Sequence, residues 1–283
     1  MQDAGLFLGL ALLAALLPTG MPVAARLIFK YTAQRLLRRS AKGGQLSIGE
    51  PQASARGAIA QALRLNLAGG AAEVLAILAS IVAYAQWHLV PAMNVQQILA
   101  IDLLALSLPV AALSHDHKLG RVHGRLLNRS TLLSLGFFGA IAGALTYLNY
   151  VFFFVRHTLS AAYLDPSLPL YHQAMAVSLA TLVLCLYAYL LFDRADSQTR
   201  FFAKHLWSNE RLLCALGISL LLVFLAIYAP PLQWLLKTGP LSAMDWLTAI
   251  FVALLYSCFR LLQRHTRQHS HRAVVKLHRE VRA

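Results

Sequence analysis

The feature that most constrains this chain is a series of apolar stretches, each long enough to cross about 30 Å of hydrocarbon as a helix. Strands satisfy their backbone groups in lipid only as a closed barrel, and the alternating pattern of a barrel is absent from this sequence. The sequence therefore predicts an all-α integral membrane protein with seven transmembrane helices. We place these spans roughly at residues 4–30, 58–87, 95–114, 131–155, 172–192, 211–229 and 244–262.

The basic residues predict how these spans are oriented. With the N-terminus outside, all Lys and Arg residues except Arg156 and Lys237 fall on the cytoplasmic side, as the positive-inside rule requires. The first apolar stretch carries no Lys or Arg before Arg26, so we interpret it as a retained span and not as a signal peptide. We expect a multi-pass protein of the plasma membrane, in bacteria the inner membrane, with its N-terminus out and its C-terminus in.

The same charge pattern bears on partners and domains. The net charge of +14 lies almost entirely in the predicted cytoplasmic segments, so we expect contact with anionic lipid headgroups and no nucleic-acid partner. No polar segment is long enough to build a core of its own. We expect one membrane domain, 1–283, with a short cytoplasmic linker at 35–57 and a basic cytoplasmic tail at 264–283.

The first predicted span is interrupted at its centre by the sequence LLPTGMPVAARL. Pro22 has no N–H to donate to the carbonyl of Pro18, and Gly20 allows the chain to unwind at little steric cost. The sequence predicts a helix break at Pro18, Gly20 and Pro22, with the hydroxyl of Thr19 beside the freed carbonyls.

Three stretches resemble P-type cation-transporting ATPases. LLPTGMPVAARLIFKYTAQRLLRRSAKG resembles the fourth transmembrane helix of that family, in which a Pro-Glu-Gly-Leu-Pro break precedes a basic stalk. GAIAQALRLNLAGGAAEVLAILASIVAYAQWHLVPAMNVQQILAIDLLALSLPVAAL resembles the fifth and sixth helices, and IYAPPLQWLLKTGPLSAMDWLTAIF resembles the link between the ninth and tenth. The resemblance implies that the chain corresponds to helices four to ten of that fold.

The resemblance also implies what is missing. The family carries its Asp-Lys-Thr-Gly-Thr loop and its nucleotide-binding domain between the fourth and fifth helices, whereas here roughly 40–56 stands in their place. The sequence contains no Asp-Lys-Thr-Gly, and nothing in it matches the actuator domain. We therefore expect a pseudoenzyme that neither forms an acyl phosphate nor hydrolyses ATP.

Two carboxylates fall inside predicted spans, where ionisable groups are costly and usually functional. Glu73 matches the glutamate of the family's fifth helix, and Asp102 matches the asparagine of its sixth. With Thr19, they form a candidate site for an ion or a proton. The alternative is that both carboxyl groups only hold helices together through hydrogen bonds.

Other family ligands are lost. Apolar residues or glycine stand where the resemblance places further ligands of the fifth, sixth and eighth helices: Gly70, Ala105, Leu106 and Leu184. The remaining oxygens are too few for a Ca²⁺ cage of six to eight ligands. They suffice for a proton relay, a monovalent ion or a buried structural pair.

Histidines and cysteines offer little more. His265 and His269 lie four residues apart, without a third ligand at a defined spacing, and the three cysteines show no metal-binding pattern. We expect neither a metal centre nor a cofactor.

Three functions remain open at this stage. The first is an accessory, regulatory or assembly subunit related to cation transport that binds another membrane protein. The second is a passive or proton-coupled channel or carrier that uses Glu73 and Asp102. The third is the membrane half of a split cation pump.

Overall fold

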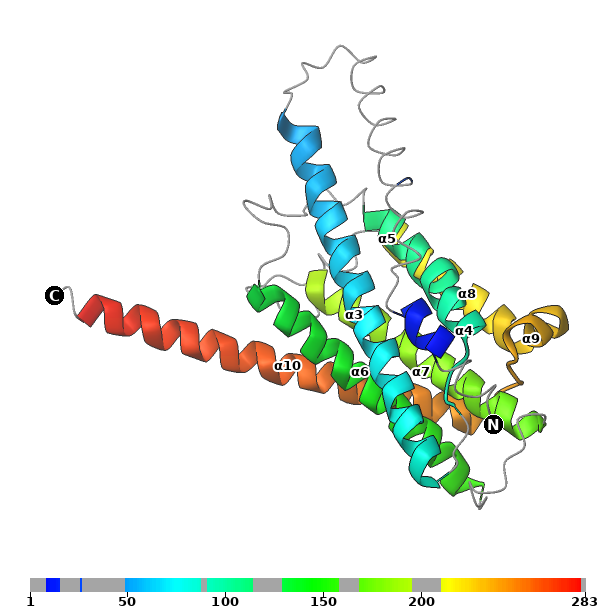
Figure 1. Ribbon diagram of the computed structural model, residues 1–283. Coiled ribbons are helices and arrows are strands. Elements are labelled where there is room, and N and C mark those ends of the chain that lie inside the picture. The colour runs from blue at the N-terminus through cyan, green and yellow to red at the C-terminus, as the bar shows by residue number, and fades with distance from the viewer. Residues whose placement is uncertain are drawn as a thin grey trace, which may run out of the picture.

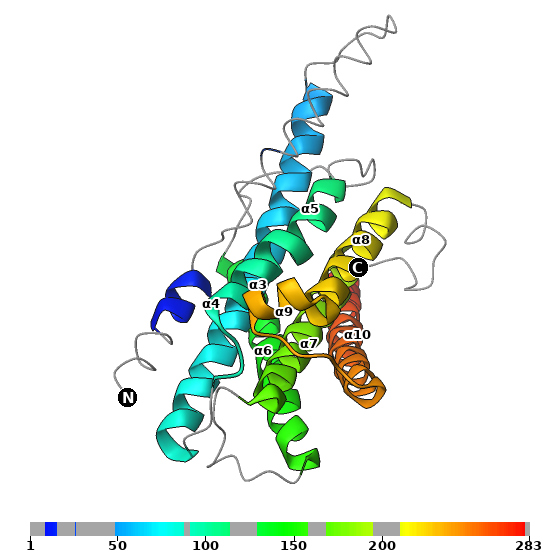
Figure 2. The same ribbon diagram turned by 90° about the vertical axis from the view of Figure 1, so that its right-hand side faces the viewer.

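The structure of the chain is a computed structural model that describes residues 9–15, 26, 49–87, 91–113, 129–157, 168–194 and 210–280 (Figures 1 and 2). Throughout these ranges the chain forms helices joined by short connections, and the described part contains no strand. The prediction of an all-α protein is confirmed.

The helices follow one another along the chain as antiparallel spans. They are α3 (Gly49–Trp87), α4 (Val95–Ala100), the π-helix η1 (Ile101–Leu106), α5 (Ser107–Leu113), α6 (Arg129–Arg156), α7 (Pro169–Arg194), α8 (Glu210–Tyr228), the short α9 (Pro230–Leu236) and α10 (Ala243–Glu280). Helices α4, η1 and α5 are continuous and form one span.

Six helices in the described part are long and apolar enough to cross a membrane. They are Ile59–Gln86, Val95–Ala112, Arg129–Arg156, Pro169–Phe192, Glu210–Tyr228 and Ala243–Gln263. Six of the predicted spans are therefore confirmed, with ends that differ by only a few residues, and the chain is a multi-pass membrane protein. Of the predicted first span, residues 9–15 are helical, but most of that span lies outside the described residues, so a seventh span stays a prediction.

Two helices continue beyond their apolar parts. Helix α3 begins at Gly49, inside the segment predicted as a linker, and α10 continues to Glu280, through most of the segment predicted as a tail. Figure 1 shows the N-terminal part of α3 and the C-terminal part of α10 running out of the helix bundle. The backbone of both segments is therefore more regular than their polar composition indicates.

Helix α7 lies at the centre of the bundle. It packs against α6 and α10, between which Figure 2 shows it, and also against α3. Most of its apolar span is buried within the protein, whereas α8 and α10 keep most of theirs on the surface. In the absence of a hydrophobic driving force between helices in lipid, such a centre depends on close van der Waals packing.

The closest packing joins α3 to α6. On α6, Gly139 and Gly143 form a Gly-x-x-x-Gly pair. A Cβ atom added at Gly139 would lie 2.5 Å from the carbonyl oxygen of Ala68, and one at Gly143 would meet the backbone of Ala72. Small residues at this spacing let two helix backbones approach directly, as in other membrane helix pairs. This contact fixes the depth of α3, the helix that carries Glu73.

Two prolines shape the turn from α8 into α9. Pro230 and Pro231 have no N–H, so the carbonyls of Ala226 and Ile227, four residues earlier, lose their helical donors. Side chains replace these donors. The Thr238 hydroxyl donates to the Ala226 carbonyl and the Gln233 amide donates to the Ile227 carbonyl, both at a distance of 2.6 Å. The sequence analysis left 230–243 as a connection between two predicted spans and missed this short capped helix.

Candidate functional site

Glu73 lies near the middle of the apolar span of α3. The preceding residues are small, Gly-Gly-Ala-Ala, which lets neighbouring helices come close to the α3 backbone on several sides. The Glu73 side chain is only 1% exposed, and its Oε1 atom has no hydrogen-bond partner among the described residues. A buried carboxylate oxygen without a hydrogen-bond partner is costly inside a membrane protein.

Asp102 lies in the first turn of η1 and is 4% exposed. The π-helical turn is followed by a proline in α5. Pro109 has no N–H for the carbonyl of Ala105, so this carbonyl loses its α-helical donor. The hydroxyl of Tyr187 on α7 donates a hydrogen bond of 3.2 Å to the Ala105 carbonyl instead. The Ser107 hydroxyl donates to the carbonyl of Leu103 in the same segment. Single π-helical turns inside α-helices occur often at functional sites.

The fold brings Glu73 and Asp102 together, although they are far apart in the sequence. Their carboxyl groups are close enough for their charges to repel each other inside the protein. Leu106 of η1 also packs against Gly69, one helical turn before Glu73. A Cβ atom added at Gly69 would lie 3.4 Å from a methyl group of Leu106. A proton or a cation between the two carboxyl groups would offset the repulsion. The structure thus brings the two predicted carboxylates near each other in the interior of the helix bundle, where both are buried.

The rest of the predicted site is only partly visible. Thr19, Pro18, Gly20 and Pro22 lie outside the described residues. The helical segment 9–15 just before them packs on α3: Ala11, Ala14 and Ala15 form a small apolar cluster with Ile77 and Ile98.

Gly70 explains how this segment comes so close. A Cβ atom at Gly70 would lie 2.9 Å from the carbonyl oxygen of Ala15, so the missing side chain admits the backbone of the first helix. Leu106 and Ala105 are buried and apolar, and Leu184 packs against the same core. These three positions supply no side-chain ligand.

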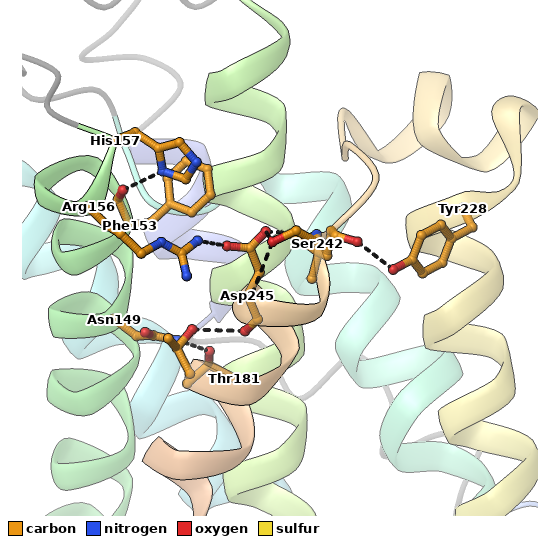
Figure 3. A network of polar contacts seen from close by, with 10 residues as sticks. Asn149, Phe153, Arg156, His157, Thr181, Tyr228, Ser242 and Asp245 are labelled. Atoms are coloured by element: carbon orange, nitrogen blue, oxygen red, sulfur yellow. Dashed lines mark hydrogen bonds and ion pairs between the residues drawn. The ribbon is translucent and has the colours of Figure 1, made fainter.

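Figure 3 shows a second polar group of residues that the sequence analysis missed. It includes the first turn of α10, whereas the basic tail belongs to the C-terminal part of the same helix. Arg156 at the end of α6 forms an ion pair with Asp245 at the start of α10. The Asp245 carboxylate also accepts hydrogen bonds from the backbone N–H of Ser242, at 2.8 Å, and from the Ser242 hydroxyl, at 2.6 Å. The signal was present as Ser-x-x-Asp before an apolar run, which is a capping box. This ion pair neutralises one of the two basic residues predicted on the outer side.

Two amides inside the spans were also missed. Asn66 on α3 and Gln97 on α4 are 4% and 0% exposed, and each has polar side-chain atoms without a partner in the described part of the chain. The sequence did contain a signal for both residues, because an amide side chain within an otherwise apolar span can form hydrogen bonds between helices. No three His, Cys, Asp or Glu residues gather around a common point among the described residues, and the side chains of His265 and His269 lie outside them.

Comparison with known proteins agrees with this architecture. The sequence model of the family described as "Cation transporting ATPase, C-terminus" matches residues 90–264. The protein is also 29% identical, over 196 residues, to a calcium-transporting ATPase of Bacillus subtilis (strain 168). This alignment covers 66% of the present chain but only 20% of that relative. Because the family match covers more than half of the sequence, the chain belongs to the P-type cation-transporting ATPase family, whose C-terminal membrane region it contains.

Proposed function

We propose that this chain is a non-catalytic membrane subunit related to cation transport, which acts by binding another membrane protein. The observation that carries the proposal is the replacement, at roughly 40–56, of the family's phosphorylation loop by a short segment without Asp-Lys-Thr-Gly. The membrane helices and the buried pair Glu73–Asp102 are nevertheless kept. A chain without the aspartate that accepts phosphate cannot drive transport by itself.

The outer surfaces of α8 and α10 support a membrane partner. These two spans are the least buried of the six in the described part. Their exposed side chains include large apolar residues at helical spacing, among them Leu221, Phe224, Phe251 and Leu254. Lipid or another helix covers such a surface in a membrane.

The test has two parts. The protein purified in nanodiscs should neither hydrolyse ATP nor form an acid-stable phosphoprotein, while a P-type ATPase with an intact loop does both. Purification from native membranes in several mild detergents should return a defined complex, with photo-crosslinks from Phe224 and Phe251 to one partner. Phosphoprotein formation, or a monomer in every detergent, would contradict the proposal. A partner that carries Asp-Lys-Thr-Gly-Thr would identify the chain as the membrane half of a split pump.

The orientation is part of the proposal. We place the N-terminus outside and the basic face, including the C-terminal part of α10, in the cytoplasm of a bacterial inner membrane, against anionic headgroups. Reporter fusions after residues 123, 204 and 283 should be active only for a cytoplasmic reporter, and fusions after 163 and 238 only for an exported one. The reverse pattern would refute this topology.

A second candidate function is favoured by the buried pair itself. Glu73 carries an oxygen that has no partner in the described part of the chain, and it lies close to Asp102 on a π-helical turn. Such an arrangement suits a passive or proton-coupled channel or carrier. In proteoliposomes, cation-dependent or proton-dependent flux should be lost when Glu73→Gln is combined with Asp102→Asn. The exposed Glu210→Gln is the matched control. Flux that is unchanged in the double variant would exclude this route.

A further inference from the structure

We propose that Asn66 and Gln97 hold water on either side of the carboxylate pair, so that Glu73 and Asp102 form the middle of a hydrated proton route through the bundle. The route is closed on the basic side by Leu106 and Leu186. This inference rests on the proton or cation role proposed above for Glu73 and Asp102.

The first observation concerns Asn66. It precedes Glu73 by seven residues on α3, so the two side chains lie on the same face, within about 20° of each other and about 10.5 Å apart along the axis. Asn66 is 4% exposed. Its Nδ2 donates to the carbonyl of Ala62 over 2.9 Å, but its Oδ1 has no partner among the described residues. The same face of α3 thus carries, at different depths, two buried oxygens that have no partner among the residues the structure describes.

The second observation concerns Gln97, which lies on the other side of the pair. Helix α4 begins near the outer end of the bundle, where Asn94 donates to the carbonyl of Leu236. Gln97 therefore lies between that end and Asp102, about 7 Å along the axis from it. Its side chain is fully buried, and both its Nε2 and Oε1 lack a partner within the described residues.

Burial of these two amides without water or another hydrogen-bond partner is unfavourable. An amide taken from water without a replacement hydrogen bond destabilises the folded protein. Buried water commonly satisfies such groups, with two to four hydrogen bonds to each molecule. The two buried amides lie on either side of the Glu73 oxygen, which has no partner among the described residues. This arrangement points to water bound at successive depths in the bundle.

Between Asn66 and Glu73 the same face of α3 is apolar. Gly69 lies there, and a Cβ atom on it would be 3.4 Å from a methyl group of Leu106 and 3.5 Å from one of Leu186. Both leucines are 1% exposed. They close the space left by the missing side chain and separate the water near Asn66 from the carboxylate pair. A small rotation of either leucine would join the two parts of the route.

Thiol accessibility tests the hydrated positions. In a background with the three native cysteines replaced by alanine, Asn66→Cys and Gln97→Cys should react with a small charged methanethiosulfonate. Because the reactive thiolate forms only in contact with water, we expect rates about tenfold higher than for Leu65→Cys and Ile98→Cys. These neighbours are 1% and 0% exposed and lie in apolar clusters. Equal rates for all four variants would overturn the inference.

Thermal stability gives a second measurement if a cysteine variant does not fold. In a dry site, Asn66→Leu and Gln97→Met remove an unpaired polar group and should raise the unfolding temperature. In a hydrated site they displace bound water that already satisfies the amide, so the temperature should stay unchanged or fall. A clear rise in both variants would refute bound water at these positions.

The closure is tested in the same background. Combined with Glu73→Cys, the variant Leu106→Ala should raise the reaction rate with reagent added from the basic side. Leu103→Ala, on the exposed side of the same turn, should not. Equal rates would refute the closure.

The two proposals can fail separately. Inaccessible thiols together with flux that depends on Glu73 and Asp102 would refute the hydrated route alone. Accessible thiols together with flux independent of both carboxylates would refute the carrier function, and with it the proton route, while confirming water at Asn66 and Gln97.

Discussion

Replacement of Gly139 by alanine should force α3 and α6 apart. The Cβ atom would lie 2.5 Å from the carbonyl oxygen of Ala68 and 2.6 Å from the Cβ atom of Ala71. The first of these neighbours is a backbone atom of a long helix, so it cannot rotate away as a flexible side chain can. The backbones must therefore separate along much of their contact.

The magnitude follows from this geometry. A normal carbon–oxygen contact of about 3.4 Å requires an added separation of roughly 0.9 Å, and gaps of 0.5–1 Å forfeit a quarter to a half of the dispersion energy. Overpacking of this kind costs about 1–3 kcal/mol. The higher helix propensity of alanine, compared with glycine, offsets up to about 1 kcal/mol of this cost. We expect Gly139→Ala to lower the free energy of unfolding by about 1–2 kcal/mol, and Gly143→Ala, which meets only backbone atoms, by more.

The assay is the fraction of monodisperse protein that remains after heating in detergent, measured by size-exclusion chromatography. Gly136→Ala is the matched control, because it lies on the same helix and a Cβ atom there would meet nothing within 4 Å. We expect the control to be as stable as the parent or slightly more stable. If Gly139→Ala and Gly136→Ala have the same midpoint, the close packing of α3 on α6 is wrong.

Three further variants test other contacts by the same measurement. Arg156→Met leaves the carboxylate of Asp245 buried without its cation and should cost about 3 kcal/mol, whereas adding Asp245→Asn should recover part of this loss; full additivity of the two changes would argue against the ion pair. Asn149→Leu and Thr181→Val each remove an interhelical hydrogen bond of 2.8 Å, so a double-mutant cycle should give a coupling of about 1 kcal/mol, and zero coupling would contradict the bond. Arg260→Leu removes a guanidinium that lies 4.1 Å from the ring centre of Phe138 and 4.6 Å from that of Tyr189. It should lower the free energy of unfolding by about 1–2 kcal/mol, and Arg260→Lys should lower it by less. An unchanged midpoint in Arg260→Leu would speak against both ring contacts.

The spans were predictable because lipid makes a local demand on the sequence. Each span must be apolar over the thickness of the hydrocarbon, whatever its neighbours are. The predicted range 131–155 therefore agrees with α6 (Arg129–Arg156), and 244–262 agrees with the apolar part of α10. The family resemblance was also local, since it rested on short motifs within the spans, and the family match confirms it.

The irregular parts were harder to predict. Pro109 indicates a disturbed helix, but the π-helical turn it accompanies also depends on Tyr187, which comes from another helix. In α9, the signals were Pro230 and Pro231, and the donors that complete the turn follow in the next residues. A proline shows where a backbone donor is missing, whereas the tertiary structure decides which group replaces it.

The sequence by itself determined the class of the protein, the depth of each carboxylate and the family to which the chain belongs, because span length and motif order are properties of the chain alone. Only the tertiary structure decided that the buried side chains of Glu73 and Asp102 lie near each other. It also decided that Gly70 admits the first helix and that Arg156 has a buried partner. These features depend on which faces of separate helices meet, and that choice is made by close packing between helices that are all equally soluble in lipid.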